Sequence, residues 1–172
     1  NMGDEADLVV AFNEQVLYGR IEQGAYKPGT VVLLENKWAK SDLEEIRTQY
    51  ADALEDFKKA ELVVHELPLE EEVSKIVPEA RVGKNMFILG LLTSIFDLNR
   101  EKLAAIIDRQ FGKKDASVLR NAMLAFDAGY SYPVSESLGK DYGIAPGTIQ
   151  DEHRIATDGN QMMTCGLLAA GV

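Results

Sequence analysis

The side chains that most often carry catalysis or hold metals are scarce in this sequence of 172 residues. It contains one cysteine, Cys165, and two histidines, His65 and His153, which lie far apart along the chain. A single cysteine allows no internal disulfide, no four-cysteine iron–sulfur cluster and no cysteine-rich zinc site. The sequence therefore predicts no metal site within these residues and places any redox centre elsewhere.

The sequences around His65 and Cys165 favour a structural role for each of these side chains. His65 lies inside an apolar segment, and an imidazole there could titrate near neutral pH. No cysteine, serine or second histidine accompanies it in a nucleophile–base pattern, which favours a hydrogen-bonded structural histidine. Cys165 lies in an apolar stretch and is expected to be a buried, inert thiol.

Polar and aromatic residues follow two of the segments that we expect to be strands. Asn13 and Glu14 follow the first segment, and Glu35 and Trp38 follow the second. Ligands of open α/β sheets bind at the carboxyl ends of the strands, so all four are candidates for contacts with a cofactor or partner domain. Asn13 and Glu14 have a favoured alternative, capping of the next helix. For Trp38, packing on a partner and ordinary edge packing both stay open.

Alternating strand and helix signals in the first 67 residues predict an α/β fold with a small, open and mainly parallel sheet. The sequence Lys27-Pro28-Gly29 predicts a turn before the second strand. Ser41 and Glu44 have the spacing of a capping box at the start of a helix. The expected strands are Ala6–Phe12, Thr30–Leu34 and Glu61–Leu67, and the expected helices between them are Gln15–Ile21 and Ser41–Lys59.

The sequence after Pro68 predicts a helical C-terminal half that flanks the sheet. Asn99 and Asp115 are expected N-caps, and Gly129 is expected just beyond a helix end, where a positive φ is needed. The expected helices are Glu70–Val77, Asn85–Phe96, Asn99–Phe111 and Asp115–Ala128. Residues 130–154 lose this periodicity and suggest an extended linker. Asp158–Val172 predicts a capped apolar helix, and its position suggests that the natural polypeptide continues.

Charge and hydropathy exclude some classes of partner. The net charge of −10 argues against nucleic acid, whose binding depends on lysine and arginine. No segment approaches the roughly 20 apolar residues of a membrane-spanning helix, and no secretory signal is visible. We therefore expect a cytoplasmic protein that binds neither nucleic acid nor membrane.

Several motifs, in their order along the chain, resemble the gamma domain of the 2-oxoacid:ferredoxin oxidoreductases. An asparagine before an apolar helix is followed by a glycine, and a second asparagine precedes Ala-Phe and Gly-Tyr. The last residues resemble the glycine-rich signature that opens the alpha subunit of the same family. The residues that carry the resemblance are Asn85 and Gly90, Asn121, Ala125-Phe126 and Gly129-Tyr130, then Gly159, Asn160, Gly166, Ala170 and Gly171.

This resemblance implies a division of the chain into three parts. Residues 1–129 would be a gamma-type domain, residues 130–154 an extended linker, and residues 155–172 the start of an alpha-type domain. This order is similar to the fused large subunit of 2-oxoglutarate-type enzymes. The glycine-rich strand–loop–helix unit that opens the family's gamma domain does not precede Asn1, so the domain is expected to be N-terminally incomplete.

The resemblance also implies a function for the whole enzyme. It would convert a 2-oxoacid, expected to be 2-oxoglutarate, to an acyl-CoA and CO2 while reducing ferredoxin, with thiamine diphosphate, magnesium, iron–sulfur clusters and coenzyme A. Within it, this segment is expected to be a structural and assembly domain near the coenzyme A side, inactive alone and binding no cofactor itself. Its partners would be the alpha-type and beta-type parts of an oligomer, and ferredoxin through the complex. Two alternatives are a non-catalytic interaction module and the second half of an NAD(P)-type dehydrogenase.

Overall fold

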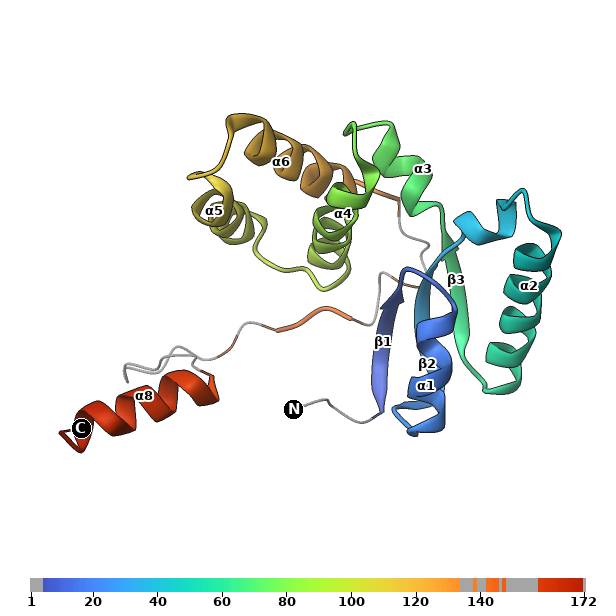
Figure 1. The fold of residues 1–172 in the computed structure, drawn as a ribbon, viewed down its shortest axis with the longest axis horizontal. Helices are drawn as coiled ribbons and strands as arrows, with labels where there is room; N and C mark the ends of the chain where they lie inside the picture. The colour runs from blue at the N-terminus through green and yellow to red at the C-terminus, as the bar shows by residue number, and fades with distance from the viewer. Residues whose placement is uncertain (1–4, 134–137, 139–141, 146, 148–157, 172) are drawn as a thin grey trace.

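Three parallel strands form the sheet in the computed structural model, which describes residues 5–133, 138, 142–145, 147 and 158–171. The strands are β1 (Ala6–Ala11), β2 (Tyr26–Glu35) and β3 (Val63–Leu67). They lie in the order β1-β2-β3 with both pairings parallel, and α1 (Gln15–Glu22) and α2 (Glu44–Lys59) connect them (Figure 1). The predicted α/β class, with a small, open and parallel sheet, is confirmed.

The predicted turn at Lys27-Pro28-Gly29 is wrong, because these residues lie inside β2. The register of β1 against β2 shifts between Ala6 and Leu8, whose partners are Tyr26 and Val31. Gly29 has φ +83°, and Pro28 lacks the N–H that a regular ladder would need. The signals for a turn therefore mark a bulge, where the strand leaves and re-enters regular pairing.

Each face of the sheet is covered by a different set of helices. Alternate residues of β2 point to opposite faces, because side chains in a strand alternate. Val32 and Leu34 pack with Leu17 of α1 and Phe57 of α2. On the other face, Val31 and Leu33 pack against the helical C-terminal half, in a cluster that includes Leu69, Val73, Phe87, Leu91 and Ile95. The β2 strand thus lies at the centre of the core.

The C-terminal half consists of helices, as predicted, but several boundaries differ. A 3-10 turn, η1 (Lys37–Lys40), follows β2; then come α3 (Leu69–Ser74), α4 (Ala80–Ile95), α5 (Arg100–Phe111) and α6 (Ala116–Tyr130). Asn85 does not open α4, because that helix begins at Ala80. Gly129 does not follow the end of α6 and has no positive φ; it is buried inside the helix. The buried residues Ala80, Gly83, Lys84 and Phe87 have helical spacing, which accounts for the early start of α4.

Two family-motif glycines allow α4 and α6 to cross closely. A Cβ built on Gly90 would lie 2.0 Å from the carbonyl oxygen of Phe126, and one on Gly129 would lie 1.8 Å from that of Phe87. No side chain fits at such distances, so each glycine is required by the backbone of the opposite helix. Packing between helices, and not helix termination, explains Gly129.

The predicted helix caps at Asn99 and Asp115 are present. The Asn99 side chain accepts a hydrogen bond from the Lys102 N–H (2.8 Å), and Asp115 accepts one from Ser117 N–H (2.8 Å). The capping box at Ser41 is wrong: α2 begins at Glu44, and its N-cap residue is Leu43. Ser41 Oγ accepts a hydrogen bond from Leu43 N–H (3.3 Å), ahead of the helix.

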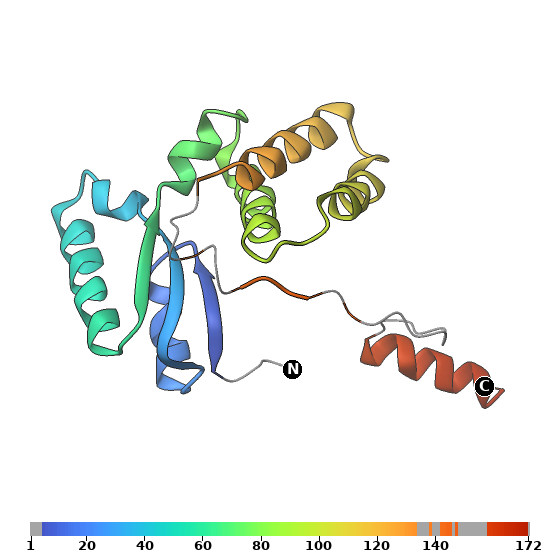
Figure 2. The same cartoon turned by 180° about the vertical axis from the view of Figure 1, so that it is seen from behind.

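The last described element is the predicted apolar helix, α8 (Gly159–Ala169), capped by Asp158, which accepts from Gln161 N–H (2.8 Å). Its residues are exposed, and both views of the fold show it apart from the sheet and from α4–α6 (Figures 1 and 2). Cys165 is therefore exposed, and the expectation of a buried thiol is wrong. Among the described residues, no helix has the length and apolar character needed to cross a bilayer.

Candidate functional site

A cavity of about 370 Å³ lies where β1 and β2 end, and we call it the edge cavity. The turn after β2 contributes Lys37 and Trp38, and Phe12 follows β1 directly. Glu70 comes from α3, and the first half of α4 closes the cavity with Arg81, Lys84 and Asn85. This is the position at which open parallel sheets bind their ligands.

A buried ion pair at the edge cavity connects the sheet to the helical half. Lys84 Nζ lies 3.0 Å from Glu35 Oε2, and it also contacts the carboxylate of Glu70. The Glu35 side chain is fully buried at the end of β2 and accepts hydrogen bonds from the N–H groups of Lys37 (3.2 Å) and Glu70 (2.9 Å). One carboxylate therefore fixes the starts of η1 and α3 and holds Lys84 of α4.

The ion pair favours the charged forms of Lys84 and Glu70. Burial opposes the charge on Lys84, but hydrogen bonds with Glu70 and Glu35 outweigh it and raise the pKa of Lys84 above its usual value of 10.5. The hydrogen bond from Lys84 in turn lowers the pKa of Glu70 below its usual 4.5. The edge cavity is therefore lined by three cationic side chains, Lys37, Arg81 and Lys84, and by the anionic Glu70. Because Lys84 is already paired with Glu70 and Glu35, Lys37 and Arg81 are the cations open to a ligand.

Trp38 supplies an aromatic surface beside these charges. Its ring is half-buried against the α1/α2 side of the core, and Lys37 Nζ lies 4.4 Å from the ring centroid. The indole Nε1 is buried and has no hydrogen-bond partner in the described part of the chain. A buried indole N–H normally finds an acceptor, so this donor is an exception within the described residues.

The favoured interpretation of Asn13 agrees with its contacts, since its side chain accepts a hydrogen bond from Val16 N–H (3.1 Å) at the start of α1. Glu14 is buried, with 6% of its surface exposed, and makes no capping hydrogen bond. Its Oε1 accepts from the side chain of Gln15 (3.2 Å), while Oε2 is buried without a partner among the described residues. Neither residue lines the edge cavity.

A second cavity, of about 600 Å³, lies between the N-terminal halves of α4 and α6, and we call it the helix cavity. Its lining is largely apolar, with Val77, Val82, Met86, Phe111 and Val118. Asn85 from α4 and Asn121 from α6, which lie 36 positions apart in the sequence, both line it. Arg81 and Asn85 line both the helix cavity and the edge cavity, so the two are adjacent.

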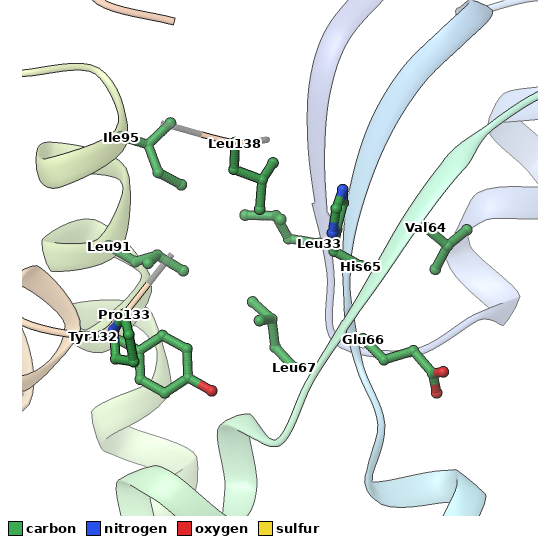
Figure 3. A pocket seen from close by; sticks show the side chains of 10 residues that line it. All are labelled: Leu33, Val64, His65, Glu66, Leu67, Leu91, Ile95, Tyr132, Pro133 and Leu138. Carbon is green, nitrogen blue, oxygen red and sulfur yellow. The ribbon is translucent and has the colours of Figure 1, made fainter. Parts of the chain in front are cut away.

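A third cavity, of about 330 Å³, lies against β3 and contains His65 (Figure 3). Figure 3 shows Leu33, Leu67 and Leu138 around the space, while the Glu66 carboxylate points away from it. Glu66 instead accepts a hydrogen bond from the Tyr50 hydroxyl (2.8 Å). The His65 ring makes no hydrogen bond to another described residue, so the expectation of a hydrogen-bonded histidine is wrong for this part of the chain, and His65 has no hydrogen-bonded acid–base partner there.

The arrangement favours binding over bond-making chemistry. The edge cavity combines cations with an aromatic ring, a combination suited to an anionic ligand. Within the described ranges, no group of three or more histidine, cysteine, aspartate or glutamate residues could hold a metal ion. With one cysteine in the whole chain, the residues present do not fit an iron–sulfur cluster.

The structure brings some of the predicted site residues together and separates others. Asn85 and Trp38 meet at the edge cavity, and Asn85 and Asn121 meet at the helix cavity. Gly90 lies at the helix crossing, and Gly159 and Asn160 lie on α8, away from both cavities. Sequence analysis missed Arg81 and Lys84. Lys84 lies just ahead of the predicted helix Asn85–Phe96, so its burial follows only from the earlier start of α4.

Comparison with known proteins identifies the family. Residues 2–132 match the family described as "Pyruvate ferredoxin/flavodoxin oxidoreductase". The chain belongs to this family. The matched residues include all those that line the edge cavity and the helix cavity, and the match ends just after α6.

Two relatives extend the comparison. The 2-oxoglutarate oxidoreductase subunit KorA of Mycobacterium tuberculosis is 27% identical over 177 residues, which cover 98% of this chain and 27% of that protein. A solved structure of 2-oxoglutarate:ferredoxin oxidoreductase from Magnetococcus marinus, with 2-oxoglutarate, coenzyme A and succinyl-CoA bound, has a TM-score of 0.60 at 23% identity. That alignment covers 85% of this chain and 23% of the solved chain, and it shows a shared fold. The chain spans about a quarter of the length of these relatives.

Proposed function

We propose that this chain is the gamma-type part of a 2-oxoglutarate:ferredoxin oxidoreductase, followed by the start of the alpha-type part. The family match over residues 2–132 carries the proposal, and the curated relative, named a 2-oxoglutarate oxidoreductase subunit, aligns over 98% of the chain, α8 included. The whole enzyme would form succinyl-CoA and CO2 from 2-oxoglutarate and reduce ferredoxin. Thiamine diphosphate, magnesium and iron–sulfur clusters would be held by its other parts.

The role proposed for this segment is to assemble the enzyme and to form part of the coenzyme A side. The edge cavity supports the second role, because Lys37 and Arg81 suit phosphate groups and Trp38 could stack on a planar ring. Of these cations, Arg81 has no ion pair to another described residue, and Lys37 is 3.6 Å from Glu70 at a partly exposed rim. The described residues that line the edge cavity include no serine, threonine, cysteine or histidine, so the chain should be inactive alone.

Lys37→Gln in the assembled enzyme tests the coenzyme A assignment. A hydrogen bond to a charged group contributes about 1.5–3 kcal/mol, so the KM for coenzyme A should rise about tenfold or more. The KM for 2-oxoglutarate should stay unchanged. The assay is 2-oxoglutarate-dependent reduction of ferredoxin at varied coenzyme A.

Lys40→Gln is the matched control, because Lys40 belongs to the same 3-10 turn but pairs with Glu71 and does not line the cavity. It should leave both KM values unchanged. Equal KM values for coenzyme A in Lys37→Gln and wild type would disprove the proposal that this segment forms part of the coenzyme A side. An assembled enzyme that reduces no ferredoxin with 2-oxoglutarate would disprove the proposed activity.

A further inference from the structure

The helix cavity has features that neither the proposed reaction nor the packing of this chain explains. Asn85 and Asn121 line it from two different helices, and neither side chain makes a hydrogen bond to another described residue. Asn85 is exposed, Asn121 is half-buried, and Val82 beside them is 64% exposed. The cavity is thus an open groove with a largely apolar lining and unpaired amides on its two walls.

The chemistry of the groove matches a polypeptide backbone. A side-chain amide carries both a donor and an acceptor, so it can pair with the C=O and the N–H of one peptide unit. Arg81, at the start of α4, adds guanidinium donors for a backbone carbonyl and has no ion pair or side-chain hydrogen bond within the described residues. Between these polar groups, Val82, Met86 and Val118 provide a surface for an apolar side chain.

We infer that the helix cavity binds an extended polypeptide segment from another part of the assembled oxidoreductase. An apolar side chain of this segment would lie between α4 and α6, with its backbone hydrogen-bonded to Asn85 and Asn121. The inference rests on the proposed function, which supplies the rest of the enzyme. It also draws on chain length, because about three quarters of each relative lies outside the region that this chain matches.

An extended segment fits this groove because the lining offers both kinds of contact that peptide binding uses. Peptide-binding grooves obtain affinity from main-chain hydrogen bonds and specificity from pockets for single side chains. The two asparagines and the apolar lining provide these two elements.

Photo-crosslinking in the assembled enzyme tests the inference. Val82→p-benzoylphenylalanine places the probe at the groove, and exposure of Val82 makes the fold tolerant of the change. Leu124→p-benzoylphenylalanine is the control, since Leu124 lies on α6, is 45% exposed and does not line the groove. We expect the Val82 probe to give one main product, mapped by mass spectrometry to a polypeptide segment outside these 172 residues, and the Leu124 probe not to label that segment.

Removal of the amides should weaken this contact specifically. Asn85→Ala with Asn121→Ala should lower the cross-linking yield of the Val82 probe at least about fivefold, while Gln49→Ala on α2 should not. No polypeptide product in an active enzyme, a yield independent of the two asparagines, or an adduct with coenzyme A would each overturn the inference and leave the proposed function intact. Failure to assemble an active enzyme would overturn both.

Discussion

Two glycines, one on each helix, determine how closely α4 and α6 approach. We predict that Gly129→Ala destabilises the protein by about 2–4 kcal/mol, because its Cβ would lie 1.8 Å from the Phe87 carbonyl oxygen and would force the helices apart. Urea unfolding followed by circular dichroism measures the change. Gly19→Ala in α1 is the matched control: a Cβ there meets nothing within 4 Å, so the variant should be more stable by about 0.5–1 kcal/mol. Similar losses in both variants would contradict the packing explanation.

A single lysine compensates two carboxylates at the sheet edge. We predict that Lys84→Met destabilises the protein by about 3–5 kcal/mol at neutral pH, because Glu35 stays buried without its cation. Lys75→Met removes exposed pairs with Glu71 and Glu72 and should cost less than about 1 kcal/mol. Urea midpoints of the two variants and wild type give the comparison, and equal costs would show that the buried pair contributes no more than a surface pair.

The same lysine makes stability depend on pH. The pKa of Glu70 is lower in the folded protein than its usual 4.5, chiefly through the hydrogen bond from Lys84. Such a group binds more protons when unfolded, so its contribution is present above 4.5 and is lost as pH falls through the folded pKa. The stability difference between wild type and Lys84→Met should therefore narrow as pH falls from about 5 to about 3. A difference that widened in this range would rule out this role of Glu70.

At the scale of elements, two variants test which residues cap α5 and α2. Asn99→Ala should cost about 1 kcal/mol, because it removes the acceptor for the Lys102 N–H at the start of α5. Ser41→Ala should change stability by less than about 0.5 kcal/mol, because Ser41 lies ahead of α2 and does not cap it. The check is the unfolding free energy of each variant at one pH. An equal loss in both would mean that Ser41 does cap α2 in solution.

At the scale of the whole molecule, α8 is a helix with no buried residue. Cys165 is exposed on it, so a disulfide reagent should label one thiol per folded chain at nearly the rate seen in denaturant. If residues 155–172 begin an alpha-type domain, as we propose, labelling should slow at least about tenfold in the assembled enzyme. Stopped-flow absorbance gives both rates. Slow labelling of the isolated chain would mean that α8 packs on this chain after all.

The sequence alone determined which segments form strands and helices, because burial of alternating or helically spaced apolar residues is a local pattern. The β1–α1–β2–α2–β3 order, the caps at Asn99 and Asp115, and the apolar helix α8 all follow from such patterns. The order of the motifs along the chain also indicated the family, which the match over residues 2–132 confirms.

Only the tertiary structure decided where those patterns meet. Gly129 resembles a helix terminator in sequence, yet the Phe87 backbone of another helix requires it. Lys84 and Glu35 lie 49 positions apart and form one buried ion pair, and Asn85 and Asn121 line one groove from two helices. The turn signal at Lys27-Pro28-Gly29 became a bulge because β1 pairs on both sides of it. In each case the deciding partner is distant in the sequence, so local propensity contains no information about it.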